Sequence, residues 1–184
     1  MRVFGIDPGS ERTGYGCVDS DGQRHQLVAC GAIVVPARAT FPERLRLIHE
    51  GLVALIRECR PDVAAVESLF HAANVRSALK LGHARGVAML AAVESGLTVA
   101  EYSPAEIKRA LVGYGRAEKH QVAEMIRLLL HLDVVPTPHD ASDALAVAIC
   151  HLHAASGAVA PANEAGRVPR SWRHWRPPSG TRPS

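Results

Sequence analysis

The sequence lacks the features that mark secreted proteins, proteins held together by a structural metal, and membrane-spanning proteins. Its four cysteines show no CxxC spacing, and Asp7 interrupts the first apolar run, so nothing at the N-terminus resembles a signal peptide. The longest apolar run on a helical pattern, residues 86–93, is far shorter than the about 20 residues that a membrane span needs. We therefore expect a cytoplasmic protein with reduced cysteines and no membrane partner.

The chain also lacks an excess of charge in its main part. The 184 residues carry a net charge of +3, but residues 1–156 hold 16 Lys and Arg against 17 Asp and Glu, whereas residues 157–184 hold five Arg against one Glu. This length suits one domain that buries about two-thirds of its unfolded surface. We predict one domain over residues 1–156 and a disordered basic tail, rich in Pro, Arg and Trp, over residues 157–184. If the domain binds nucleic acid, it does so through a local basic patch.

Apolar and β-branched runs predict three strands at the start of the chain, over residues 3–7, 14–18 and 26–35, arranged as an antiparallel meander. After these strands we predict a helix over 41–60, a strand over 63–67, a helix over 74–95, a strand over 97–102, and helices over 105–112, 118–132 and 139–155. This order predicts an α/β fold. Its five-stranded mixed sheet has three antiparallel strands, then parallel strands, and is flanked by helices on both faces.

The first predicted strand ends at Asp7, directly before a Pro8-Gly9 turn. Pro8 removes a backbone donor and Gly9 tolerates a positive φ, so the chain must turn directly after the carboxylate. An aspartate at the end of a strand could instead cap the turn through its own backbone. The local pattern leaves both roles of Asp7 open.

Three further acids lie at the ends of predicted elements. Glu67 ends the fourth predicted strand, and Asp140 and Asp143 lie three apart, on one face at the start of the last helix. Like charges raise one another's pKa, so a fold tolerates four clustered carboxylates mainly where divalent cations neutralise them. Mg²⁺ prefers such oxygen ligands, and two ions can activate water and stabilise the leaving oxygen of a phosphodiester. The alternatives are a surface position for Glu67, and N-cap or helix-dipole roles for the two aspartates.

Four separated segments carry a family resemblance. The segments are FGIDPGSERTGYG, AVESLFHAANVRSALKLGHARGVA, SPAEIKRALVGYGRAEKHQV and PTPHDASDALAVAICH. In this order, across residues 1–153, they resemble the bacterial RuvC family of Holliday-junction resolvases. The resemblance implies a ribonuclease-H-like fold and a structure-selective endonuclease that resolves four-way DNA junctions by paired symmetric nicks in recombination and repair. It also implies a homodimer, two Mg²⁺ or Mn²⁺ ions per active site, and the RuvA–RuvB branch-migration complex as a partner.

The same resemblance assigns roles to individual acids. Asp7, Glu67, Asp140 and Asp143 match the four catalytic, metal-binding acids of the family. Some relatives have His at the position that matches Asp140. The role of the adjacent His139 in metal binding therefore stays open, with a core or loop position as the alternative.

DNA-binding residues are also implied. The predicted set is Phe70, Asn74, Arg76, Lys80, Lys108 and Lys119. Phe70 matches an aromatic that stacks on unpaired junction bases, and such stacking is worth about 1–3 kcal/mol per base. Lys108 and Lys119 match basic positions near the scissile strand, where they would hold phosphates. Arg76 and Lys80 are four apart on the 74–95 helix, so they share a face that could follow the DNA backbone. The alternatives are a core position for Phe70 and a solvated helix face for the lysines.

Other patterns also allow more than one interpretation. Gly82 and Gly86 have GxxxG spacing, which indicates either packing on the sheet or, as the family suggests, a helix in the dimer interface. The segment GIDPGSERTG also resembles the phosphate-binding hairpin of actin-like ATPases and sugar kinases. Those proteins bind ATP between two such domains, and this chain has the length of one. The tail could be a DNA-binding arm or dispensable, and the resemblance does not cover it.

Overall fold

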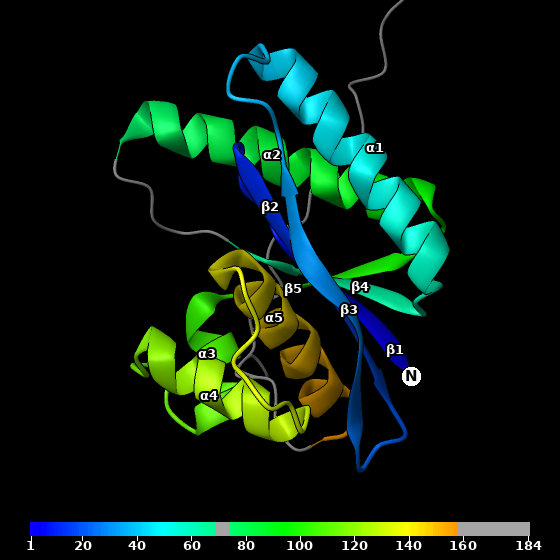
Figure 1. Cartoon of the computed structure of the whole chain (residues 1–184), viewed down its shortest axis with the longest axis vertical. Coiled ribbons are helices and arrows are strands. Elements are labelled where there is room, and N and C mark those ends of the chain that lie inside the picture. Colours follow the sequence, from blue (N-terminus) through cyan, green and yellow to red (C-terminus); the bar gives the residue numbers. More distant parts are fainter. Residues whose placement is uncertain (69–73, 158–184) are drawn as a thin grey trace, which may run out of the picture.

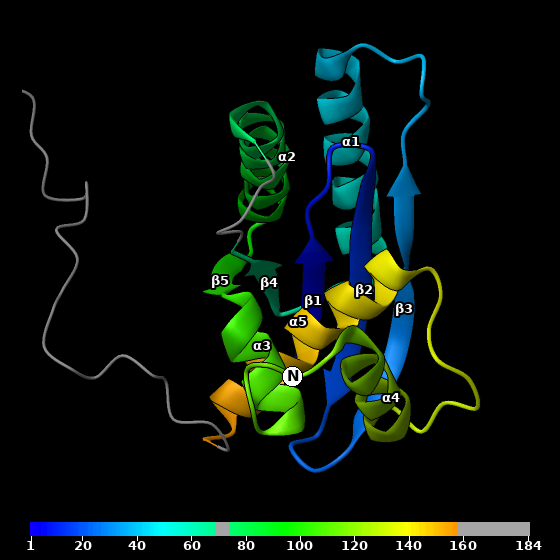
Figure 2. The same ribbon diagram turned by 90° about the vertical axis from the view of Figure 1, so that its left-hand side faces the viewer.

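Three antiparallel strands at the start of the chain form the first three strands of a five-stranded sheet. β1 (Arg2–Asp7) pairs with β2 (Arg12–Ser20), and β2 pairs with β3 (His25–Val34). β4 (Val63–Glu67) lies parallel to β1, and β5 (Thr98–Tyr102) lies parallel to β4. The spatial order is β3-β2-β1-β4-β5, which puts β1 in the centre (Figure 2). This arrangement confirms the predicted mixed sheet.

The computed structural model describes residues 1–68 and 74–157. The predicted stacking role of Phe70 and the predicted disordered tail fall outside these ranges, and both stay predictions.

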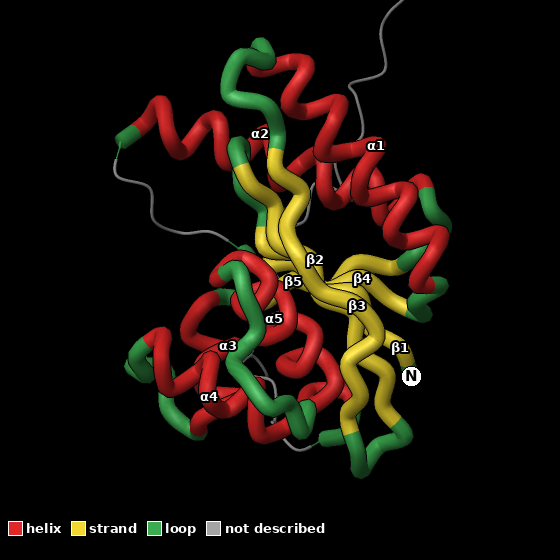
Figure 3. The backbone as a smooth tube through the Cα atoms, in the orientation of Figure 1, coloured by secondary structure: helices red, strands yellow, loops and turns green. Residues whose placement is uncertain are grey.

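Helices cover both faces of the sheet, as predicted. α1 (Phe41–Cys59) and α2 (Val75–Glu94) lie on one face, whereas α3 (Pro104–Val112), α4 (Lys119–Leu129) and α5 (His139–Ala155) lie on the other (Figure 1, Figure 3).

The largest difference from a predicted helix boundary is at α4, which ends three residues early. Leu130 is its C-cap, and His131 takes a positive φ of 53°, which a helix cannot continue through.

The pleat of the strands divides the core into two apolar clusters, one on each face of the sheet. Phe4 and Ile6 of β1 belong to the cluster with α1 and α2, whereas Val3 belongs to the cluster with α3, α4 and α5. α5 is buried on nearly all sides between Ala141 and Leu152, because it lies between the sheet and the pair α3 and α4. Its position over the sheet is therefore closely constrained by packing.

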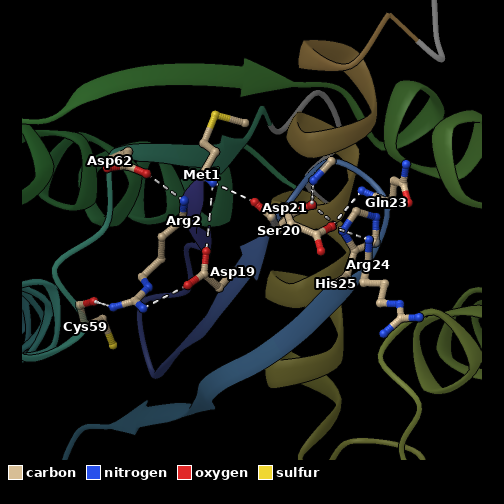
Figure 4. Close-up of polar contacts among 11 residues, drawn as sticks. Met1, Arg2, Asp19, Ser20, Asp21, Gln23, Arg24, His25, Cys59 and Asp62 are labelled. Atoms are coloured by element: carbon tan, nitrogen blue, oxygen red, sulfur yellow. Dashed lines mark hydrogen bonds and ion pairs between the residues drawn. The ribbon is translucent and has the colours of Figure 1, made fainter.

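Arg2 makes hydrogen bonds to several elements at the end of β1 that lies away from Asp7. Its guanidinium donates to Asp19 Oδ2 in β2 at 2.9 Å and to the carbonyl oxygen of Cys59, the last residue of α1, at 2.7 Å. The backbone N–H of Arg2 donates to Asp62 Oδ2, just before β4, at 2.7 Å (Figure 4). These contacts join β1, β2, α1 and the start of β4.

Within the described ranges, no helix combines the length and the apolar character required to cross a membrane.

Candidate active site

The pleat of two neighbouring parallel strands places Asp7 and Glu67 on the same face of the sheet. Asp7 continues the alternation that begins with Val3 in β1, and Glu67 continues that of Val63 and Ala65 in β4. These three apolar residues all belong to the cluster that packs against α5. Because β1 and β4 pair in parallel register, the two carboxylates end adjacent strands and point toward α5.

α5 brings the other two acids to this edge because its first turn lies directly on β2. A Cβ atom at Gly14 would lie 2.0 Å from the carbonyl oxygen of Asp140, so only glycine fits there. Asp143 follows within the next turn of α5. The N-cap of α5 is Pro138, so neither aspartate is the N-cap, although Asp140 lies in the first turn, where the helix dipole favours a carboxylate.

The turn after Asp7 is closed by the buried hydroxyl of Thr13. This hydroxyl donates to the carbonyl oxygen of Gly9 at 2.8 Å and accepts from the Gly9 N–H at 3.4 Å. Asp7 is thereby free to point at α5, and the turn-capping alternative is not needed. Gly9 does not use a positive φ; it is required because a Cβ atom there would lie 2.0 Å from the carbonyl oxygen of Arg12.

Three of the four acids line a cavity of about 310 Å³ on the face of the sheet covered by α3, α4 and α5. Its lining residues are Asp7, Glu67, Pro104, Ile107, Lys108, Lys119, Val122, Asp143 and Ala146. Asp140 does not belong to this lining, but its charge still acts on Asp7. The structure therefore brings Asp7, Glu67 and Asp143 together and places Asp140 beside them.

Burial and the charges of neighbouring acids make the carboxylates of Asp7 and Glu67 hard to ionise. Burial raises the pKa of Asp7 to about 8, and the charges of Glu67, Asp143 and Asp140 act in the same direction. Burial, followed by the charge of Asp143, also raises the pKa of Glu67. The contact between the two carboxyl groups acts to raise the pKa of Asp7 and to lower that of Glu67. The alternative that Glu67 is an ordinary surface residue is therefore wrong.

Two basic side chains bind the two carboxylates of α5. Lys119 Nζ, at the start of α4, lies 3.2 Å from Asp143 Oδ2, and this contact raises the pKa of Lys119. Arg12 Nε, at the start of β2, lies 3.2 Å from Asp140 Oδ2. The two ion pairs thus offset part of the negative charge of the four acids, and the raised pKa of Asp7 favours its neutral form.

The donor set of the cavity suits a hard divalent cation. The acids offer carboxylate oxygens, which Mg²⁺ and Mn²⁺ prefer, and not the thiolates that select softer metals. In residues 1–68 and 74–157, no three His, Cys, Asp or Glu side chains already converge in metal-binding geometry. Asp140 and Asp143 are instead held by Arg12 and Lys119, so binding of a metal by all four acids requires these ion pairs to open.

The two lysines predicted to bind DNA near the cut strand lie beside the acids, and their contact with DNA stays a prediction. Lys108 of α3 and Lys119 of α4 both line the cavity, and both lower the pKa of Glu67 through their charges. They are thus positive groups beside the acids. The side chain of Lys119 is 83% exposed, so for this lysine the solvated helix face remains an alternative.

The other predicted DNA-binding residues lie at the start of α2. Arg76 and Lys80 are exposed, and in Figure 1 this end of α2 extends beyond α1. Asn74 is the N-cap of α2, where its Oδ1 accepts a hydrogen bond from the Ser77 N–H at 2.9 Å. Asn74 therefore has a structural role that the sequence analysis did not predict.

Two residues near the acids complete the description. His139 is exposed at the first position of α5. Arg12 was not predicted as a site residue, because a single arginine after a Pro-Gly turn carries no signal until α5 is placed over β2. Its ion pair with Asp140 connects residues 128 positions apart in the sequence.

Comparison with known proteins gives matches that span most of the chain. The sequence model of the family described as crossover junction endodeoxyribonuclease RuvC matches residues 3–151. Crossover junction endodeoxyribonuclease RuvC of Koribacter versatilis is 54% identical over 154 residues, covering 83% of this chain and 93% of that relative. The corresponding protein of Magnetococcus marinus is 52% identical over 153 residues, covering 83% and 84%. A solved structure, T. thermophilus RuvC in complex with Holliday junction substrate, is 35% identical with a TM-score of 0.82, covering 86% of this chain and 96% of that one. The structural likeness confirms the predicted ribonuclease-H-like fold.

Proposed function

Because the chain belongs to the RuvC family of crossover junction endodeoxyribonucleases, we propose that the cavity at Asp7 is where it cuts four-way DNA junctions. The protein is a Holliday-junction resolvase, a metal-dependent endonuclease of DNA recombination and repair. One observation carries the assignment of the site: Asp7, Glu67 and Asp143 converge from three elements in one cavity, and the pKa of Asp7 is raised to about 8. Such unfavourable clusters are typical of functional sites.

The four acids are the proposed ligands of two Mg²⁺ or Mn²⁺ ions. The charges of Glu67 on the adjacent strand and of the two aspartates of α5 all act on Asp7, so Asp7 would hold metal together with each of the other acids. The ions would supply the positive charge that lets all four carboxylates ionise, and would activate water and stabilise the leaving oxygen. Two observations support this assignment: the donor set consists of oxygen atoms, and the charges of the neighbouring acids raise the pKa of Asp7.

The side chains around the acids have separate tasks in the hydrolysis. In the reaction, a water oxygen forms a bond to phosphorus and the bond from phosphorus to the 3′ oxygen breaks, which leaves a 5′-phosphate and a 3′-hydroxyl. Glu67 is the proposed acceptor of a hydrogen bond from the attacking water. Lys108 and Lys119, which line the same cavity, bind phosphate oxygens and stabilise the charge that develops on them.

Paired, symmetric nicks require two copies of the active site, and we propose that the second copy docks on α2. The exposed residues Val75, Leu79, Gly82, Gly86, Leu90 and Val93 repeat every three or four positions along one side of this helix, here called the α2 stripe. Leu79 is 60% exposed and Val93 59% exposed. Among the described residues, a Cβ atom at Gly82 or Gly86 would meet nothing within 4 Å, so the alternative that these glycines pack on the sheet is wrong. A second copy of this apolar stripe, related by a two-fold axis, would cover it.

Two further parts of the proposal follow from family membership. The RuvA–RuvB branch-migration complex is the proposed partner, and the cytoplasm is the proposed location. The four free cysteines support a reducing compartment.

The proposed activity is tested on a labelled synthetic four-way junction and a linear duplex of the same sequence. With Mg²⁺ or Mn²⁺, the full chain should cut two symmetrically placed strands of the junction, leave the duplex intact, and yield ends that a ligase can join. Chelation with EDTA should abolish cutting. Equal cutting of junction and duplex, or cutting in EDTA, would contradict the proposal.

A further inference from the structure

The ion pair between Arg12 and Asp140 is built into the fold. Arg12 and Gly14 lie two residues apart on β2, so their side-chain positions lie on the same face of the strand. Because the first turn of α5 lies on Gly14, the Arg12 side chain reaches the carboxylate of Asp140 with Nε at 3.2 Å from Oδ2. The contact follows from the way in which the helix and the strand pack.

We propose that Arg12 is an internal counter-ion of Asp140. Its guanidinium pairs with the Asp140 carboxylate until a divalent cation binds there, and it then binds a phosphate of the DNA. This inference rests on the proposed function, because it takes Asp140 as a metal ligand.

The first step is a competition for the same carboxylate. A guanidinium in contact with Asp140 and a divalent cation on that carboxylate repel each other, so the cation binds only as Arg12 withdraws. The side chains of Arg12 and Asp140 are 50% and 32% exposed, and ion pairs as exposed as this are weak. Arg12 should therefore reduce metal affinity by only about two- to fivefold.

The second step uses the released guanidinium. Once Asp140 holds a metal, Arg12 is a half-exposed cation beside the active site, and its planar fork matches phosphate oxygens. Lys119 has the same relation to Asp143, at the same distance of 3.2 Å. Metal binding thus converts two internal ion pairs into two cations that face the substrate.

Mn²⁺ titration of the full chain by calorimetry tests the first step without measuring cleavage. Arg12→Gln should bind Mn²⁺ about two- to fivefold more tightly than the wild type. Arg12→Lys keeps a cation and should stay near the wild type. Arg46→Gln is the matched control, because it removes an exposed arginine that pairs with Glu50 in α1 at 2.7 Å.

Salt dependence of junction binding tests the second step, with Ca²⁺ in place of Mg²⁺ to slow hydrolysis. The slope of log K against log salt is negative, and loss of one phosphate contact reduces its magnitude by about 0.9. We expect this shallower slope for Arg12→Gln and an unchanged slope for Arg46→Gln. Unchanged melting temperatures would show that the variants fold.

Two results would overturn the inference. One is Mn²⁺ binding by Arg12→Gln that is equal to or weaker than that of Arg46→Gln, and the other is an unchanged salt slope. Asp140→Asn separates this failure from failure of the proposed function. If Asp140→Asn weakens Mn²⁺ binding but Arg12→Gln has no effect, only the role of Arg12 is wrong; if Asp140→Asn has no effect, the metal assignment of Asp140 fails as well.

Discussion

At the scale of single residues, Asp7 occupies a position where its charge is unfavourable. Asp7 ends its strand at a cavity that Glu67 and Asp143 also line, and burial is the largest cause of the raised pKa of Asp7. Without bound cations, the ionised carboxylate of Asp7 would therefore be more stable in the unfolded chain than in the fold. The candidate active site contributes instability that packing elsewhere must offset.

Replacing Asp7 by Asn should therefore stabilise the protein. The folded pKa of about 8 lies above the model value of 3.8, so between these values the folded chain keeps a proton that the unfolded chain releases. The free energy of unfolding then falls as pH rises through this window. In EDTA at pH 7.5, urea denaturation should show Asp7→Asn at least about 1 kcal/mol more stable than the wild type.

Asp133→Asn, an exposed change away from the cavity, is the control for this comparison and should lie within about 0.5 kcal/mol of the wild type. A finding that Asp7→Asn is no more stable than this control would show that the carboxylate of Asp7 does not destabilise the fold.

The acids could be predicted from the sequence because each one ends a strand or begins a helix with a clear pattern. Asp7 and Glu67 follow apolar runs, and Asp143 follows Asp140 on a helical face. Arg12 could not be predicted, since its role depends on the packing of α5 against β2, which no local pattern records. The capping role of Asn74 could be anticipated in principle, because Asn before a helix is a frequent N-cap.

At the scale of elements, the strands and helices were predictable wherever hydrophobic periodicity and turn residues agree. β1 stops at a Pro-Gly turn, and α3 begins at Pro104 after the capping residue Ser103. The end of α4 was less predictable, because Leu130 and Leu132 continue the apolar pattern while the backbone leaves the helix at His131. Periodicity records which side chains are buried, and a helix can end before that pattern does.

The α2 stripe is the proposed contact between two copies of the chain. Leu79→Glu should break the proposed dimer and leave the monomer folded, because this side chain is 60% exposed. Sedimentation should show a shift from dimer to monomer, and cleavage should change from paired cuts to slow single nicks. The matched control is Leu128→Glu in α4, at a leucine that is 52% exposed on the other face of the sheet. A Leu79→Glu protein that sediments as the wild type does would place the dimer contact elsewhere.

At the scale of the whole molecule, the sheet and α5 bring together acids that lie up to 136 positions apart, from Asp7 to Asp143. The order of the elements was sufficient to predict this sheet, and the family match over residues 3–151 agrees with it. The cationic partners of the aspartates and the orientation of α2 emerge only from the assembled fold. The proposed function depends on three features of the described residues, which are the acids at the cavity, Lys108 and Lys119 beside them, and the α2 stripe.

The most direct test of the central claim compares Asp7→Asn with the wild type on a synthetic four-way junction in Mg²⁺. Binding and cutting are measured on the same labelled DNA, by gel shift and by denaturing gel. Because the variant keeps the shape of the side chain but loses the charge that would hold the cations, we expect retained junction binding and cutting reduced by at least about 10³-fold. Cutting by Asp7→Asn at the wild-type rate would contradict it.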